Sequence, residues 1–160
     1  MRPLDLSIDE ALYEVRRSVL SMGAKRVVID SLSGFELALA PTFREDFRES
    51  LYRMTGALTG MGVTIIMTVE IVDSYIDLQL SPHGLTFLTD GIILQRYVEM
   101  DGRLQKILTV VKLRASDHSK DLRSYKITAD GLVIGEALRD YREVLTGVPK
   151  LTGPPRESTD

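Results

Sequence analysis

Apolar residues recur every three or four positions in two stretches of the first half of the chain, and this spacing predicts two amphipathic helices. The first stretch follows a capping box at residues 7–10 and stops before Gly23, so we expect a helix over residues 7–22. The second begins at another capping box, residues 42–45, and ends before Gly60. These two helices are the most regular feature of the chain.

Two short, continuous apolar runs, residues 26–30 and 63–69, each follow one of these helices. Such runs are typical of parallel strands that are buried on both faces. The order helix, strand, helix, strand predicts an α/β fold, a parallel sheet covered by helices. A Ser/Gly stretch at 31–34 carries no predicted element, and the mixed segment 71–90 is expected to be a long connection.

The second half of the chain changes to an antiparallel pattern. Strands are expected over residues 91–100 and 103–114, because Asp101-Gly102 between them is a strong two-residue hairpin signal. A polar loop over 115–121 leads to a second, shorter hairpin around Asp130-Gly131. The sheet therefore continues from parallel into antiparallel strands.

Composition narrows the function classes. The 160 residues carry 20 basic and 23 acidic side chains, and this mildly acidic balance argues against a dedicated nucleic-acid binder. Cysteine is absent, which excludes disulfides and a thiol nucleophile. With no membrane-spanning run and no signal peptide, we expect a cytoplasmic protein, one domain over 1–148 and a linker or frayed tail over 149–160.

Two carboxylates follow the predicted parallel strands. Asp30 ends the first strand, and in phosphate-handling proteins an aspartate there holds Mg²⁺. A strand-end residue that caps the next turn is the other interpretation of Asp30, and the residue alone favours it. Glu70 ends the neighbouring strand and is the second candidate there.

Cationic residues gather near the end of the predicted strand 103–114. Lys112 and Arg114 are two positions apart and therefore share a face of the strand, and His118 follows in the loop. Such a cluster suits phosphate oxygens, although a solvated edge strand protected by lysine fits the spacing equally well. Ser116-Asp117-His118 is not a hydrolytic triad, because three consecutive side chains diverge.

A phosphate cradle is missing from this set. The chain contains no G-x-x-x-x-G-K-[ST] and no G-x-G-x-x-G motif. The aspartate and the cationic cluster therefore make up half of a nucleotide site.

Four stretches together resemble the KaiC family of RecA-like ATPases: residues 24–33, 89–99, 102–103 and 108–118. The most specific is the last, which holds a strand followed by Lys-x-Arg-x-x-x-His. The likeness runs from about residue 4 to 149. It implies a RecA-like α/β fold and ATP held with Mg²⁺ between the subunits of a hexameric ring.

The resemblance also implies roles for single residues. Asp30 is similar to the Walker B aspartate that supports Mg²⁺, with Ser31 beside it. Thr68 and Glu70 are placed where RecA-like proteins carry polar sensing residues. Phosphate contacts are implied for four more side chains, three of which (Lys112, Arg114 and His118) would act in trans on a neighbouring subunit's ATP, while the fourth, Arg96, approaches from the same side.

Departures from the family pattern shape the expected function. The P-loop and the catalytic carboxylate pair are missing, so we expect that this chain alone does not hydrolyse ATP. The chain matches the C-terminal two-thirds of one domain, as a fragment, a truncated reading frame or a short paralogue would. Ala115 replaces a family glycine, a change expected to be mild, and Thr86-Phe87 stands where the clock kinase carries its phosphorylated pair.

Three functional hypotheses follow. The first is an ATP-binding ring subunit. The second is a non-catalytic regulatory module that pairs with a full-length KaiC-like subunit. The third, a recombinase-like protein on DNA, is disfavoured by the acidic balance and the lack of an aromatic-basic stripe. Without the P-loop strand, apolar edges at 27–29 and 63–69 are expected to be covered by self-association.

Overall fold

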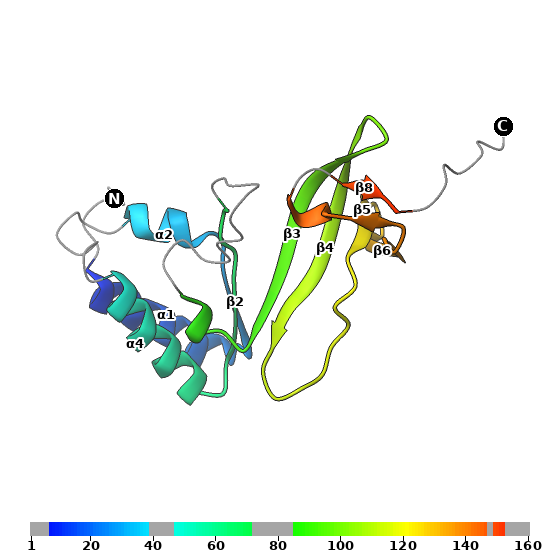
Figure 1. The fold of residues 1–160 in the computed structure, drawn as a ribbon. Coiled ribbons are helices and arrows are strands. Elements are labelled where there is room, and N and C mark those ends of the chain that lie inside the picture. The colour runs from blue at the N-terminus through cyan, green and yellow to red at the C-terminus, as the bar shows by residue number, and fades with distance from the viewer. Residues whose placement is uncertain (1–6, 39–46, 72–84, 147–148, 153–160) are drawn as a thin grey trace. The chain divides into compact units, whose positions relative to one another are not determined.

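The computed structural model describes residues 7–38, 47–71, 85–146 and 149–152. The chain divides into two compact units, each described by itself below (Figure 1). The N-terminal unit comprises the chain up to residue 72 together with residues 81–88, and the C-terminal unit comprises residues 89–160 together with 73–80. No helix among the described residues is long and apolar enough to cross a membrane.

The N-terminal unit alternates helices and strands as predicted. Its elements are α1 (Ile8–Met22), β1 (Arg26–Ile29), α2 (Leu32–Ala38), α4 (Phe47–Gly60), β2 (Thr64–Met67) and the short 3₁₀ turn η1 (Leu85–Phe87).

Helix α1 ends at the predicted residue and begins at Ile8, one residue after the predicted start, because Ser7 is its N-cap. The Ser7 hydroxyl accepts a hydrogen bond from the Glu10 backbone N–H at 3.2 Å, and the Glu10 carboxylate accepts one from the Ser7 backbone N–H at 3.0 Å. These hydrogen bonds to Ser7, the backbone one first, lower the pKa of the Glu10 carboxyl from its ordinary value. Gly23 closes the helix in the left-handed conformation at φ 60°.

Helix α2 was not predicted. The Ser31 hydroxyl accepts a hydrogen bond from the Gly34 N–H at 3.3 Å, which satisfies one free donor of the first turn. Leu32, at 1% exposure, anchors the helix in the core. The Ser/Gly stretch therefore starts a helix rather than forming a loop. The second predicted capping box, residues 42–45, lies outside the described residues, and α4 is described from Phe47.

Strands β1 and β2 pair in parallel, in the register Arg26↔Thr64 to Ile29↔Met67. One face of this sheet packs against the core of the N-terminal unit, which α1, α2 and α4 supply (Figure 1). The other face carries Val28 and Ile66, which are 61% and 49% exposed. The apolar runs are thus covered on one face within the described residues, although continuous apolar runs are typical of strands covered on both.

The C-terminal unit contains a four-stranded sheet in the order β3-β4-β5-β6 (Figure 1). Its elements are β3 (Gly91–Met100), β4 (Arg103–Leu113), β5 (Arg123–Thr128), β6 (Gly131–Ala137), β7 (Tyr141–Arg142), η2 (Val144–Thr146) and β8 (Lys150–Leu151). This sheet confirms the predicted antiparallel second half. Among the described residues its strands pair with neither β1 nor β2, so the prediction that the parallel sheet continues into these strands is wrong.

The two hairpin turns differ in how closely they match the prediction. Asp101 and Gly102 form the first turn. Both have a positive φ, 53° and 70°, as the central residues of a type I′ turn require. In the second hairpin Thr128 pairs with Gly131, so Ala129 and Asp130 are the turn residues, one position earlier than predicted.

A second, separate core lies in this unit. Its buried side chains are Val98, Met100, Ile107 and Val144. Strands β7 and β8 pair antiparallel, so residues 150–151, inside the predicted linker, form a strand. The rest of that segment from residue 153 lies outside the described residues.

Candidate functional site

Polar side chains lie at the carboxyl edge of the β1–β2 sheet. Asp30 directly follows β1 and Thr68 directly follows β2. The Thr68 hydroxyl donates a hydrogen bond of 2.5 Å to the Asp30 Oδ1 atom. The Thr68 backbone N–H donates to the Ile29 carbonyl at 3.0 Å, and its carbonyl accepts from the Leu32 N–H at 2.9 Å. The backbone on both sides of Thr68 therefore holds its hydroxyl beside Asp30.

Ser31 and Glu70 have different surroundings at this edge. The Ser31 hydroxyl is half-buried and engaged at the start of α2, next to the cis peptide bond that joins it to Asp30. Glu70 is exposed two residues beyond Thr68. Asp30, Ser31 and Thr68 thus lie at one sheet edge, where a direct side-chain contact joins Asp30 to Thr68, and Glu70 follows farther along the chain.

The donor set at this edge fits Mg²⁺. Carboxylate and hydroxyl oxygens are hard ligands, and Mg²⁺ in nucleotide sites uses one or two carboxylates, waters and substrate phosphates. Asp30 is an exposed residue, so its carboxylate is accessible from solvent. Within the described ranges there is no cluster of three or more His, Cys, Asp or Glu residues that forms a complete metal cage. The edge therefore suits a metal that arrives with a phosphate ligand.

The cationic cluster lies in the C-terminal unit, where β4 ends. The Lys112 Nζ atom donates a hydrogen bond of 2.8 Å to the Thr89 carbonyl. The Arg114 guanidinium forms an ion pair with the Asp90 carboxylate at 2.9 Å, and its backbone N–H donates to the Asp90 carbonyl at 2.6 Å. Both cations therefore engage the two residues that precede β3.

Asp90 was not selected from the sequence. Its place directly before a strand was the available signal, but its pairing with Arg114 comes from the antiparallel register of β3 and β4. The ion pair is exposed, at 53% for Arg114 and 77% for Asp90, so both groups remain accessible to solvent.

His118 lies in the loop between β4 and β5. Its backbone N–H donates to the Asp117 carboxylate at 2.9 Å. Both ring nitrogens are shielded from solvent and have no hydrogen-bond partner within the described part of the chain. A shielded imidazole without a partner lacks the hydrogen bonds that buried polar groups normally make.

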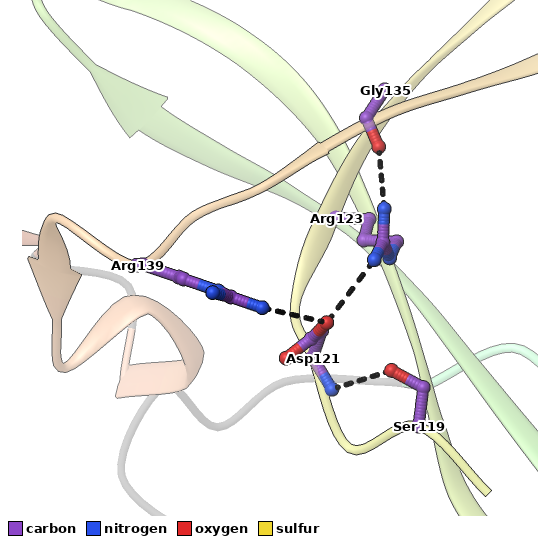
Figure 2. A network of polar contacts seen from close by, with 5 residues as sticks. All are labelled: Ser119, Asp121, Arg123, Gly135 and Arg139. Atoms are coloured by element: carbon purple, nitrogen blue, oxygen red, sulfur yellow. Dashed lines mark hydrogen bonds and ion pairs between the residues drawn. The ribbon is translucent and has the colours of Figure 1, made fainter.

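The end of this loop is held by a network around Asp121 (Figure 2). The Asp121 Oδ2 atom accepts a hydrogen bond from the Arg123 guanidinium at 3.1 Å, and the Arg139 guanidinium lies 4.0 Å away. The Asp121 backbone N–H donates to the Ser119 hydroxyl at 3.3 Å, while Arg123 also donates to the Gly135 carbonyl at 3.2 Å. The network joins the loop to β5 and β6.

Arg96, the remaining predicted contact, is half-buried in the C-terminal unit. Its guanidinium donates a hydrogen bond of 2.7 Å to the Leu145 carbonyl. Arg96 therefore has a local packing partner, and its approach to a nucleotide stays a prediction.

Comparison with known proteins identifies the family. Residues 5–139 match the family model described as the KaiC ATPase. The chain is 29% identical over 150 residues to the circadian clock protein KaiC3 of Synechocystis sp., covering 94% of this chain and 29% of that protein. It is 27% identical to the circadian clock oscillator protein KaiC of Nostoc sp., covering 92% of this chain and 28% of that protein.

A solved structure agrees in fold. The KaiC-like protein of Pyrococcus horikoshii OT3 matches with a TM-score of 0.71 and 29% identity over 82% of this chain and 56% of that one. The chain thus spans less than a third of the length of KaiC3 of Synechocystis sp. and of KaiC of Nostoc sp.. With a family model that matches most of its length and the mixed parallel and antiparallel sheets of a RecA-like fold, the chain belongs to the KaiC family of ATPases.

Proposed function

We propose that this chain binds ATP with Mg²⁺ as part of a KaiC-like assembly, in which it supplies half of the nucleotide site at each subunit interface. Lys112, Arg114 and His118 contact the phosphates of ATP held by a neighbouring subunit. The single observation that carries this proposal is that Lys112 and Arg114 both bind to residues 89–90, at the end of the strand that leads to His118, whose shielded ring nitrogens have no partner among the described residues. Arginine and lysine neutralise charge that develops on a transferred phosphoryl group.

In this proposal the carboxyl edge of the β1–β2 sheet binds Mg²⁺. Asp30 supports Mg²⁺ directly or through water, and the Thr68 hydroxyl holds the carboxylate in place. Ser31 and Glu70 flank it. Mg²⁺, when bound, supplies charge neutralisation at the phosphates. The chain lacks a P-loop motif, so we expect no ATP hydrolysis by this chain alone.

The partner is a second copy of this chain or a full-length KaiC-like subunit in the cytoplasm. The exposed apolar face at Val28 and Ile66 supports such an association, because parallel sheets are ordinarily covered on both faces. The same face favours the second candidate function, a non-catalytic module that regulates a complete subunit.

Calorimetric titration of Mg·ATP into the chain, alone and mixed with a full-length KaiC-like subunit, tests the proposal. Binding that is lost in Lys112→Ala and Arg114→Ala, but kept in Arg142→Ala, supports the site; Arg142 is an exposed arginine of β7 away from the cluster in sequence. Binding to the full-length subunit without any nucleotide dependence supports the regulatory module. Retention on single-stranded DNA that weakens with salt supports the recombinase-like alternative.

A further inference from the structure

The loop that carries His118 is held at both ends by polar contacts in the C-terminal unit. At its start, Arg114 is paired with Asp90 through both side chain and backbone. At its end, Asp121 is paired with Arg123, and the Leu122 carbonyl accepts a hydrogen bond from the Leu138 N–H at 2.8 Å. A short loop with both ends held has few conformations open to it. The backbone position of His118 therefore depends on these two anchors.

The Asp121 carboxylate lies at the centre of the contacts that hold the end of the loop. Its side chain is 33% exposed and that of Arg123 is 36% exposed, whereas Arg139 is 81% exposed and lies at the outer limit of an ion pair. Figure 2 shows the Asp121 carboxylate between the two guanidinium groups, with Arg123 reaching on to the Gly135 carbonyl. Arg123 is thus the main partner of Asp121. The ion pair with Arg139 contributes little stabilisation, because exposed pairs at this distance are screened by solvent.

Asp121 also contacts the loop itself through its backbone N–H. The Asp121 backbone N–H donates to the Ser119 hydroxyl, which belongs to the residue next to His118. One residue therefore links the strand pair β5–β6 to the immediate neighbour of the histidine. His118 itself makes no ring hydrogen bond in the described chain that would hold it in place.

We propose that Asp121 is a positioning residue, which holds the loop so that His118 is presented to the same anion as Lys112 and Arg114. The inference rests on the proposed function and extends it by a residue that does not itself touch the phosphate. A partly exposed ion pair contributes little to global stability. Its loss is therefore expected to change the loop more than the fold.

The histidine provides a direct readout. The chain contains two histidines, so the imidazole C–H resonances of His118 are assigned by comparison with a His83→Gln variant. Asp121→Ala is expected to shift and broaden the His118 resonances, and Asp121→Asn, which keeps an acceptor for Arg123, to shift them less. Arg139→Ala is the matched control and leaves them in place. Resonances of His118 that move no more in Asp121→Ala than in Arg139→Ala would overturn the positioning role.

Binding of inorganic tripolyphosphate with Mg²⁺ gives the second readout. Asp121→Ala is expected to weaken tripolyphosphate binding about fivefold. This value lies at the low end of the interaction energies measured between residues of one polar network. The same substitution made in a His118→Ala background is expected to cost nothing further, because there is no imidazole left to position. Equal losses in both backgrounds would overturn the inference in favour of a purely structural Asp121.

The two proposals fail in different ways. Wild-type chain that binds neither tripolyphosphate nor Mg·ATP, with or without a full-length subunit, would overturn the proposed function. The His118 resonances decide the positioning role in that case as well, since they report the loop without any ligand. Thermal unfolding followed by circular dichroism verifies that each variant is folded.

Discussion

The hydroxyl of Thr68 is hydrogen-bonded to the carboxylate of Asp30, across the carboxyl edge of two parallel strands. The two residues are 38 positions apart in the sequence, and strand pairing from Arg26↔Thr64 to Ile29↔Met67 brings them together. Asp30 is therefore held by a donor that directly follows the neighbouring strand. The proposed role of Asp30 in supporting Mg²⁺ needs a carboxylate that is held in this way.

Thr68→Val tests this bond, because valine keeps the shape and removes the donor. The free energy of unfolding is expected to fall by about 1 kcal/mol, the usual net value of one hydrogen bond. Mg·ATP affinity is expected to fall as well, since the Asp30 carboxylate loses its orientation. Urea unfolding and calorimetry measure the two effects. Thr64→Val, an exposed change in β2, the strand that Thr68 follows, is the control; equal affinity losses in the two variants would contradict a role for the Thr68 hydroxyl.

Ala115 adopts a left-handed conformation, with φ 59°, directly after Arg114. This conformation is costly for most residues that have a Cβ atom, so we expect the alanine in place of the family glycine to lower stability, whereas the sequence suggested a mild change. Ala115→Gly is expected to raise the free energy of unfolding by about 1 kcal/mol. Ala137, at the end of β6, has no positive φ, so Ala137→Gly is expected to lower the free energy of unfolding by a similar amount. Destabilisation by both substitutions would contradict strain at Ala115.

Arg96 is tied to the Leu145 carbonyl within the C-terminal unit. Arg96→Met keeps most of the side-chain length and removes a charged hydrogen bond, so the free energy of unfolding is expected to fall by about 2 kcal/mol. Arg103→Met, at the exposed start of β4, is expected to change it little. Denaturant unfolding of both variants measures this. A stable Arg96→Met variant with weakened Mg·ATP binding would instead favour a direct nucleotide contact.

The capping box of α1 makes stability depend on pH at the acid end. Because hydrogen bonds from Ser7 lower the pKa of Glu10 in the folded state, its stabilisation is present above the ordinary value of 4.5. It is lost as the pH falls through the lower folded pKa. Unfolding free energies of the wild type and Glu10→Gln are therefore expected to differ at pH 7 and to converge in acid.

Ser7→Ala removes the other half of the same capping box. The free energy of unfolding is expected to fall by about 1 kcal/mol, the usual cost of losing an N-cap. Ser21→Ala, near the opposite end of α1, provides a comparison, because its hydroxyl donates only to the Ser18 carbonyl of the same helix. Equal losses of unfolding free energy from the two substitutions would mean that the Ser7 cap stabilises the fold no more than the Ser21 hydrogen bond does.

Local patterns in the sequence determined most of the elements of this protein. The capping box at residues 7–10, the apolar runs at β1 and β2 and the Asp101-Gly102 turn depend on contacts between near neighbours, which periodicity and turn residues reveal. The residues 108–118 likewise carried the family resemblance that the match over residues 5–139 confirmed.

Other features were decided by tertiary structure alone. Burial of Leu32 anchors α2 in a Ser/Gly stretch where no helix was predicted, and its Ser31 cap was the one local signal there. The partners Asp30–Thr68, Arg114–Asp90 and Asp121–Arg139 are polar pairs whose members come from separate segments. Polar residues at loops and strand ends have many possible partners in the sequence, and only strand register and packing select one. The candidate site residues Asp30, Lys112, Arg114 and His118 were therefore selected from the sequence, whereas Asp90, Asp121 and the other contacts around them came only from the structure.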